Sequence, residues 1–160
     1  MSQLSQLEHR IHTEIPLSRH LGVRLTEFDG DALVVAAPLA SNVNHQGTGF
    51  GGSLYSVGVV AAWGLVDLWL ENAGLAGNVV VQQASIEYTA PVDEDFFAVA
   101  RAATDKELER FLATVARHGK GRLTVTAQLY TGMPGRQPAG LAKAVLQGQF
   151  VVRDARSLTQ

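Results

Sequence analysis

The chain has 160 residues, of which 46% are hydrophobic, with 13 basic and 15 acidic side chains, a net charge of −2 and no cysteine. These values predict one domain, residues 1–160, with a single core, and they exclude disulfides and cysteine nucleophiles. A near-neutral chain without a long basic run argues against nucleic acid as a partner. The polar N-terminus shows no secretory signal, so we expect a cytoplasmic protein.

The first predicted element is a short amphipathic helix near the N-terminus. Four apolar residues recur at helical spacing: Leu4, Leu7, Ile11 and Ile15. Ser5 and Glu8, three positions apart, have the pattern of a capping box, and Pro16 ends the helix. His9 and His12 have a spacing that can ligate a metal, but no further ligand cluster accompanies them, so we expect solvated histidines and no metal site.

A β-hairpin is predicted next. Residues 22–28 and 32–39 read as strands, and the turn Asp29-Gly30-Asp31 between them is a strong hairpin signal. The hairpin leads into a loop rich in Asn, His and Gly, residues 42–52. The polar loop therefore lies directly before the longest apolar segment of the chain.

That apolar segment, residues 53–71, is the element around which we expect the rest to be organised. Its only charged side chains are Asp67 and Glu71, and its apolar residues cover every direction of a helical wheel, so the helix must be buried in protein or in lipid. About 20 such residues would span a bilayer. We expect a core helix instead, because Asp67 lies inside the segment and Lys and Arg are absent from both flanks.

The clearest strand is predicted at residues 79–88, after Gly74 and Gly77 interrupt the helical pattern. Alternation with a period of two puts five residues on one face: Val80, Gln82, Ala84, Ile86 and Tyr88. This face is the more apolar one, so we expect it to point toward the long helix. Gln82 would then be a buried polar group that needs a partner.

The second half of the chain is predicted to supply three more strands and one helix. The strands are expected at residues 96–103, 122–130 and 142–153, and the helix at residues 106–117, with Gly119 and Gly121 ending it. Six strands, mostly in hairpin succession, around one buried helix indicate an α+β antiparallel architecture.

This order of elements resembles the hotdog fold, in which an antiparallel sheet of five to six strands wraps a long central helix. The run from Asn44 to Gly52 (Asn-His-Gln-Gly-Thr-Gly-Phe-Gly-Gly) is similar to the Asn-x-x-Gly-x-x-His-Gly-Gly motif of phenylacetate-type acyl-CoA thioesterases, with Phe50 where that group has His. The closest resemblance is to the thioesterase domain at the C-terminus of YiiD-type acetyltransferases, in features such as Phe50-Gly-Gly-Ser and Ala61-Ala-Trp63.

The resemblance implies thioester hydrolysis at the N-terminus of the long helix. The backbone N–H groups of Gly51 and Gly52 are candidates for the oxyanion site, since a helix N-terminus offers free donors and a positive dipole end. Asn44 is a candidate to hold water or the thioester carbonyl through its amide, and His45 is a candidate general base, because histidine titrates near neutral pH. A structural role in the loop is the alternative for both side chains.

The family's usual carboxylate is missing. In the phenylacetate-type group an Asp or Glu nine positions after the motif His activates or positions water, and that position is Val59 here. Asp67 is about sixteen residues beyond Gly51, roughly 24 Å along a helix, which is too far to replace it. Gln82 is the remaining catalytic candidate, if its side chain faces the loop across from the helix.

Two further groups are candidates for substrate binding. The first flanks the motif and consists of Asn42, Phe50 and Ser53, for which a turn residue and a helix cap are the structural alternatives. The second is a set of cations that could hold the phosphates of coenzyme A: Arg117, Lys120 and Arg122. Cations at a helix C-terminus also favour the dipole and stay solvated, which is the competing interpretation.

We therefore expect a thioesterase acting on acyl-CoA or acyl carrier protein thioesters (acyl-ACP), without a cofactor beyond the coenzyme A of the substrate. Hotdog sites form between protomers, so the resemblance implies a homodimer or tetramer. A non-catalytic module that binds acyl thioesters or lipids is the alternative, because Val59 and Phe50 stand where the acid and the His would be. A hydratase or dehydratase is less favoured, because the loop lacks the Asp-x-Asn-Pro-x-His pattern expected of one.

Overall fold

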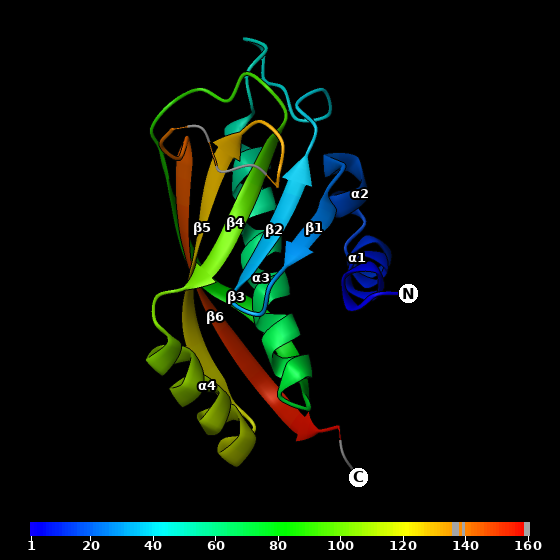
Figure 1. The fold of residues 1–160 in the computed structure, drawn as a ribbon, viewed down its shortest axis with the longest axis vertical. Coiled ribbons are helices and arrows are strands. Elements are labelled where there is room, and N and C mark those ends of the chain that lie inside the picture. The colour runs from blue at the N-terminus through cyan, green and yellow to red at the C-terminus, as the bar shows by residue number, and fades with distance from the viewer. Residues whose placement is uncertain (136–137, 139, 159–160) are drawn as a thin grey trace.

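The computed structural model describes residues 1–135, 138 and 140–158, and it shows an antiparallel sheet curved around one long helix (Figure 1). The elements follow in chain order: α1 (Gln3–Glu14), α2 (Leu17–Leu21), β1 (Arg24–Phe28), β2 (Ala32–Ala37), α3 (Gly51–Asn72), β3 (Leu75–Tyr88), β4 (Phe96–Ala102), α4 (Asp105–His118), β5 (Gly121–Thr131) and β6 (Ala144–Ser157). The six strands form one sheet in the order β1-β2-β4-β5-β6-β3, and each neighbouring pair is antiparallel. The α+β antiparallel architecture is confirmed.

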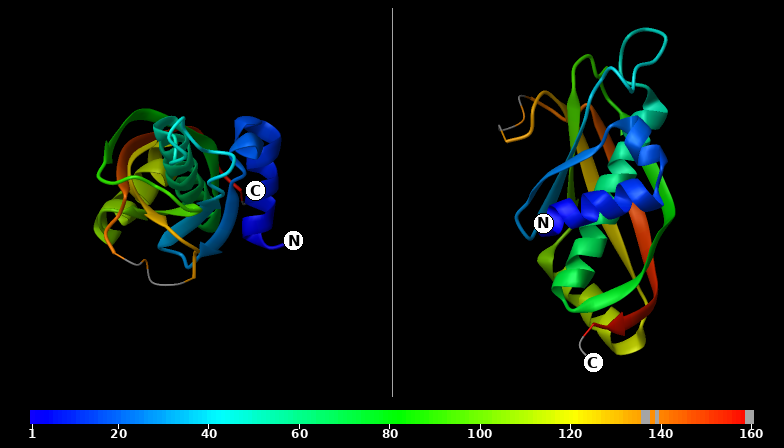
Figure 2. Two further views of the ribbon diagram at one scale, coloured as in Figure 1. Left: turned by 90° about the horizontal axis from the view of Figure 1, so that it is seen from above. Right: turned by 90° about the vertical axis from the view of Figure 1, so that its right-hand side faces the viewer.

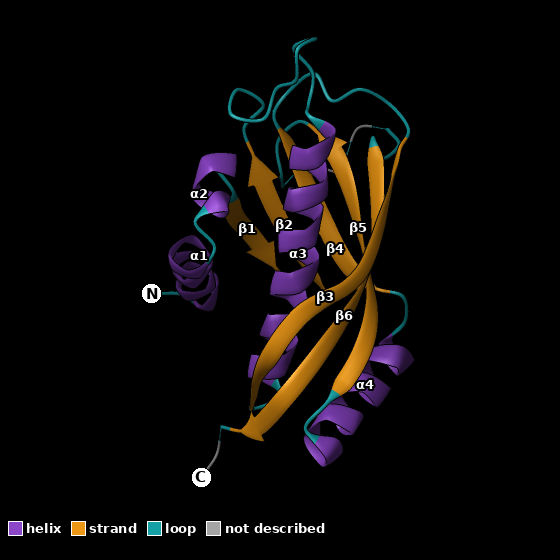
Figure 3. Ribbon diagram, turned by 180° about the vertical axis from the view of Figure 1, so that it is seen from behind, coloured by secondary structure: helices purple, strands orange, loops and turns teal. Residues whose placement is uncertain are grey.

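α3 lies along the concave face of the curved sheet (Figure 3). Glycines allow the close approach: a Cβ at Gly64 would lie 2.9 Å from the Leu33 side chain, and one at Gly58 would lie 3.3 Å from that of Leu146. In the described part of the chain, α3 is the one helix that is long and apolar enough to cross a membrane. Because most of it is buried inside the sheet, it is a core helix, as expected.

The N-terminal helix α1 packs beside β1, with Leu7 and Ile11 buried as predicted (Figure 2). Its cap differs from the prediction. Ser2, not Ser5, is the N-cap, and its hydroxyl accepts a hydrogen bond from the backbone N–H of Ser5 at 3.2 Å. Glu8 is consequently free of any capping role, and its carboxylate accepts from the backbone N–H of Leu25 at 2.7 Å instead.

The short helix α2 was not predicted from the sequence. Pro16 precedes it, where its fixed backbone angle suits a helix start, and Gly22 ends it in the left-handed conformation with φ of 69°. Five residues are too few for a periodic signal, so no pattern in the sequence could reveal it. The β1–β2 hairpin that follows is confirmed, and the backbone N–H groups of Ala32 and Asp31 hold the pKa of Asp29 below its usual value in the turn.

Strand β3 departs from the alternation predicted for it. The register against β6 shifts between Val81 and Gln83, so Gln82 lies in a bulge. Before the bulge in chain order, Val79 is buried while Val80 is 52% exposed, the reverse of the prediction. After the bulge, the predicted face does point toward α3, because the Tyr88 hydroxyl donates a hydrogen bond to the Gly51 carbonyl. The extra residue reverses the phase, so only half of the predicted face points toward the helix.

Helix α4 lies at the end of the molecule far from the start of α3 (Figure 1). Thr104 caps it by accepting from the Glu107 N–H at 3.1 Å, and Gly119 ends it with φ of 68°. Phe111 and Val115 are buried, as their spacing predicted. Gly121 was expected to belong to the helix end, but it is the first residue of β5.

Candidate active site

The loop before α3 folds as a narrow hairpin of its own. The Phe50 N–H donates to the Asn42 carbonyl at 2.7 Å, Val43 bridges Gly49, and the Asn44 N–H donates to the Thr48 carbonyl at 2.7 Å. Asn42 anchors the base, because its buried side-chain amide donates to the carbonyls of Leu21 and Pro38, each at 2.8 Å. The amide N–H groups of Asn42 therefore have a structural role, which is the alternative to the substrate-binding role expected of this residue. Its Oδ1 atom is buried and has no hydrogen-bond partner.

Asn44 is committed to holding the tip of this hairpin. Its Oδ1 atom accepts from the backbone N–H groups of Gln46 and Thr48, at 2.8 and 3.1 Å, and its Nδ2 donates to the Thr48 hydroxyl at 2.9 Å. His45 follows at the exposed tip. A strand rises about 3.3 Å per residue, so Asn44 and His45 lie roughly 7 to 10 Å beyond the Asn42–Phe50 pair. Both residues therefore lie beyond the start of α3 rather than beside it.

The N-terminus of α3 offers free backbone donors. Phe50 is the N-cap and forms no side-chain capping bond, and the first backbone hydrogen bond into the helix runs from Leu54 to the Phe50 carbonyl. The N–H groups of Gly51, Gly52 and Ser53 therefore point out of the helix start, together with the positive end of its dipole. The Phe50 ring lies against Gly52, where an added Cβ would come within 2.6 Å of it.

Tyr88 is a residue of this site that the sequence analysis did not single out. Its hydroxyl donates to the Gly51 carbonyl at 2.7 Å and fixes the end of β3 to the first turn of α3. Burial, and next the nearby Tyr55, raise the pKa of Tyr88, so it stays a neutral donor at physiological pH. The sequence predicted that Tyr88 ends a strand whose face points toward the long helix. It could not show that the Tyr88 hydroxyl contacts the first turn of that helix.

An apolar cavity of about 240 Å³ opens beside this end of α3, and we call it the α2–α3 groove. Its lining comes from three parts of the chain: Ile15, Leu17, Ser18 and Leu21 around α2; Tyr55, Ser56, Val59, Val60 and Trp63 on α3; and Val81 on β3. Ser56 lies one turn from Gly52 and donates to its carbonyl at 2.8 Å. The groove therefore adjoins the free donors of the helix start.

No carboxylate lies at the position where the resemblance places one. Val59 is half-buried and lines the α2–α3 groove. Asp67 lies two turns farther along α3 and forms an ion pair with Arg10. Gln82 is exposed in the β3 bulge and does not line the groove. The described residues contain no group of three or more His, Asp or Glu side chains that could hold a metal.

The predicted coenzyme A cations lie far from the start of α3. Arg117 is in the last turn of α4, and Lys120 and Arg122 lie around the start of β5, at the opposite end of the molecule (Figure 1). The 22 residues of α3 separate the two ends by about 33 Å. One protomer therefore brings together Gly51, Gly52, Ser53 and Phe50, but not these cations.

Comparisons with known proteins bear on the family and the fold of this chain. A sequence model of the family described as "Putative thioesterase (yiiD_Cterm)" matches residues 4–154. A protein of unknown function from Chlorobaculum tepidum TLS is 32% identical over 93% of both chains, with a TM-score of 0.85. A "putative thioesterase" from Shewanella oneidensis is 29% identical over 94% of this chain and 96% of its own, with a TM-score of 0.76.

More distant structures share the fold alone. A thioesterase from Haemophilus influenzae is 16% identical, with a TM-score of 0.70 over 100% of this chain and 94% of its own. The six-stranded antiparallel sheet around one long helix matches these thioesterases. The fold is therefore the hotdog fold that the sequence resembled.

Proposed function

We propose that this chain, which belongs to the YiiD C-terminal thioesterase family, hydrolyses an acyl thioester of coenzyme A or acyl carrier protein at the N-terminus of α3. The observation that carries the proposal is the uncapped start of α3, with two adjacent glycines and an apolar groove one turn away. Free N–H groups suit a developing oxyanion, and an apolar groove suits the acyl part of the same molecule.

In the proposed reaction the thioester carbonyl oxygen docks at the N–H groups of Gly51 and Gly52. Water attacks the carbonyl carbon, and the oxyanion of the tetrahedral intermediate is stabilised by these donors and by the helix dipole. The carbon–sulfur bond then breaks, the acid is released, and the thiolate takes up a proton. We also propose that Phe50 and Ser53 bind the substrate, and their place beside the two glycines supports this role.

We propose that water is activated by side chains at the surface of the protomer. His45 is the proposed general base, while Asn44 and Gln82 are proposed to orient the water. His45 and Gln82 are exposed, and Asn44 lies at the tip of the same loop. Because the hairpin carries Asn44 and His45 beyond Gly51, we place the reaction in the space between this loop and a second protomer, with one chain's loop facing the other's strand.

The edge of the sheet supports such a homodimer. β3 pairs with β6 on one side only, and Val80 and Val81 in its middle are 52% and 41% exposed. An open apolar edge favours pairing with another strand, and a two-fold axis makes that pairing antiparallel. The far end of the second protomer then lies beside the start of α3, which supports a role for its Arg117, Lys120 and Arg122 in binding coenzyme A phosphates.

A second candidate function is a non-catalytic module that binds acyl thioesters. Val59 favours it, because the carboxylate position holds an apolar side chain that lines the groove. In both candidates coenzyme A or a carrier protein is part of the ligand, and no separate cofactor is proposed. A cytoplasmic location is part of the proposal in both cases.

The deciding experiment is an assay of purified protein against a panel of acyl-CoA and acyl-ACP thioesters, with release of free thiol as the readout. We expect hydrolysis of at least one of them, reduced in His45→Ala. If none is hydrolysed and one binds saturably, the binding module replaces the enzyme. Equal rates for wild type, Asn44→Ala and His45→Ala would refute the assignment of the loop side chains.

A further inference from the structure

A polar pocket lies between α4 and the start of β5, and we call it the α4–β5 pocket. β4 pairs with β5 only as far as Ala102, opposite Val125, and α4 packs against the part of β5 that precedes this point. The pocket has a volume of about 230 Å³. Its polar lining consists of Glu107, Arg110 and Thr114 on α4, Arg122 and Thr124 on β5, and Gln149 on β6.

The two arginines of this pocket are not neutralised by the protein. Both ion pairs found among the described residues involve α1, so neither Arg110 nor Arg122 pairs with a carboxylate there. The Glu107 carboxylate accepts a hydrogen bond from the hydroxyl of Thr104, the N-cap of α4, at 3.2 Å. Two guanidinium groups against one carboxylate leave the pocket positive, and their planar sets of N–H donors match the oxygens of a phosphate group.

The α4–β5 pocket continues into an uncharged hollow of about 200 Å³, which we call the convex hollow. The two share Thr124 and Gln149, and the other polar side chains of the convex hollow are Gln83, Ser85 and Gln147. In the described part of the chain these five side chains form no hydrogen bond, so their amide and hydroxyl groups are available to a ligand. None of the described residues that line this hollow is aromatic, so it suits the hydroxyl groups of a sugar better than a nucleobase, which binds by stacking.

Both cavities are separated by the sheet from the proposed active site. Leu146 of β6 lies against Gly58 of α3, so the alternation along β6 directs Gln147 and Gln149 to the opposite, convex face. The start of α3 and the α2–α3 groove lie on the concave face. A molecule in the two cavities is therefore a second ligand and does not compete with an acyl group in the groove.

We propose that the α4–β5 pocket and the convex hollow together bind a phosphate monoester of a sugar, as a ligand distinct from the thioester. The phosphate lies between Arg110 and Arg122, and the sugar hydroxyls form hydrogen bonds with Gln147 and Gln149. Each cavity is larger than the roughly 150 Å³ of an engineered cavity that holds benzene, so a phosphate group fits the first and a sugar ring fits the second. This inference goes beyond the proposed hydrolysis and does not depend on it.

The test measures binding of ribose 5-phosphate, glucose 6-phosphate and inorganic phosphate by titration calorimetry. We expect saturable binding of a sugar phosphate to the wild type, weakened about tenfold or more in Arg110→Gln through the loss of a charge-assisted hydrogen bond. Arg117→Gln is the matched control, because Arg117 is on the same helix but outside the pocket, and it should keep the wild-type affinity. Gln147→Ala should weaken the sugar phosphate about threefold or more and leave inorganic phosphate unchanged, since Gln147 lines only the convex hollow.

Free coenzyme A is the second arm of the test, because it also carries a phosphate monoester and because Arg122 is among the cations proposed above to bind it. Coenzyme A that binds through Arg110, while no sugar phosphate binds, would overturn the inference, since the pocket would then hold the carrier of the substrate. Equal affinities of the wild type and Arg110→Gln for the sugar phosphate would also overturn it. Both arms are measured without a thioester, so neither result depends on whether the protein hydrolyses one.

Discussion

At the scale of single residues, Asn44 shows how a motif residue can be occupied by its own loop. Its side chain forms three hydrogen bonds within residues 44–48, two as acceptor and one as donor. The sequence placed Asn44 correctly in the motif before the helix, but it could not show how these bonds divide between loop and substrate. A structural role of Asn44 in the loop can be distinguished from a catalytic role by substitutions that remove different atoms of its side chain.

Asn44→Asp and Asn44→Ala make this separation. Aspartate keeps the oxygen that accepts from Gln46 and Thr48, whereas alanine removes it and leaves two backbone donors without that partner. If the amide N–H group binds the substrate or the water, both variants should lose activity, as the proposed role requires. A loss in Asn44→Ala alone, measured as kcat/KM on one acyl-CoA, would show that Asn44 only positions the loop.

Gln82 is the residue for which the sequence analysis failed most clearly. Period-two counting requires an unbroken strand, and the bulge between Val81 and Gln83 changes the phase in the middle of β3. Neither Gly nor Pro stands at that place to signal a bulge, so the local sequence contains nothing from which it could be predicted. The expected partner for a buried Gln82 is not needed, because the side chain is exposed.

At the scale of elements, α1 is fastened to α3 by a charged pair. Arg10 forms an ion pair with Asp67, whose side chain is 15% exposed, while that of Arg10 is 43% exposed. Burial raises the pKa of Asp67 above its usual value, and the neighbouring Arg10 only partly opposes this effect. The acid that looked out of place in an apolar helix therefore ties the N-terminal helix to the core.

This pair predicts a pH dependence of stability. An acid with a raised pKa in the folded state binds its proton more tightly there than in the unfolded chain. Its contribution is therefore most favourable below the unfolded pKa of about 3.8, and it falls as the pH rises through the folded value. Asp67→Asn cannot titrate, so the free energy of unfolding of the wild type should fall relative to this variant from pH 4 upward.

Urea unfolding of both proteins at a series of pH values measures this difference. A difference that stays constant, or that moves in favour of the wild type as the pH rises, would contradict the dominance of burial over the pairing with Arg10.

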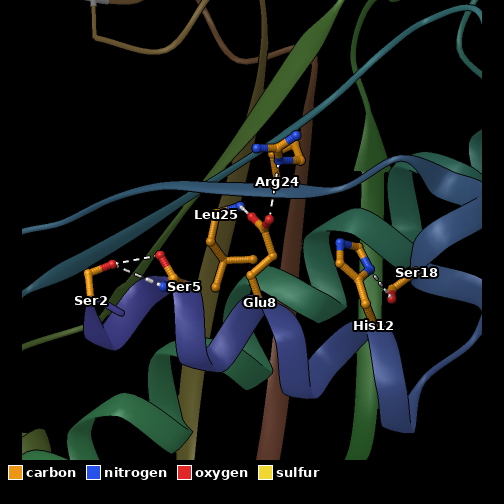
Figure 4. A network of polar contacts seen from close by, with 7 residues as sticks. All are labelled: Ser2, Ser5, Glu8, His12, Ser18, Arg24 and Leu25. Carbon is orange, nitrogen blue, oxygen red and sulfur yellow. Dashed lines mark hydrogen bonds and ion pairs between the residues drawn. The ribbon is translucent and has the colours of Figure 1, made fainter.

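Most elements were predictable because their signals are local. The helix periodicity of residues 106–117, the Asp29-Gly30-Asp31 turn and the long apolar segment each specify an element without reference to the rest of the chain. The errors lie where tertiary contacts decide. Ser2 instead of Ser5 caps α1, while Glu8 contacts Leu25 and Arg24, which lie far from it in sequence, and the short helix α2 buries Ser18 (Figure 4).

At the scale of the whole molecule, the distribution of site residues argues for assembly. The donors of α3 and the α2–α3 groove lie together, but His45 is exposed in the loop before α3. The cations around Lys120 lie at the other end of the molecule, where α4 ends and β5 begins (Figure 1). The sequence resemblance predicted these residues as one site, and only the fold shows that a single chain does not bring them together.

Dimerisation through β3 can be tested at Val80. Val80→Lys places a charge on the open edge of the sheet, which opposes strand pairing between chains. We expect the variant to sediment as a monomer and to lose activity toward all acyl-CoA substrates. Met133→Lys, at a methionine that is 76% exposed after the end of β5, should leave the oligomeric state unchanged. A Val80→Lys protein that remains a dimer would place the interface elsewhere.

The central claim is that the first N–H groups of α3 hold the oxyanion, and Gly51→Pro tests it most directly. Proline is favoured at the first position of a helix, and Phe50 before it is extended, with ψ of 129°, as a residue preceding proline prefers. The substitution removes one donor that the helix itself does not use. Gly51→Ala keeps the N–H group and has the same contact of an added Cβ with Tyr88, at 3.2 Å.

The measurement is kcat for hydrolysis of the best acyl-CoA substrate by the two variants, with urea unfolding to confirm that both are folded. We expect Gly51→Pro to lose about a hundredfold or more relative to Gly51→Ala, the usual cost of one oxyanion donor. Equal rates for the two variants would contradict the account and remove the N-terminus of α3 from the chemistry.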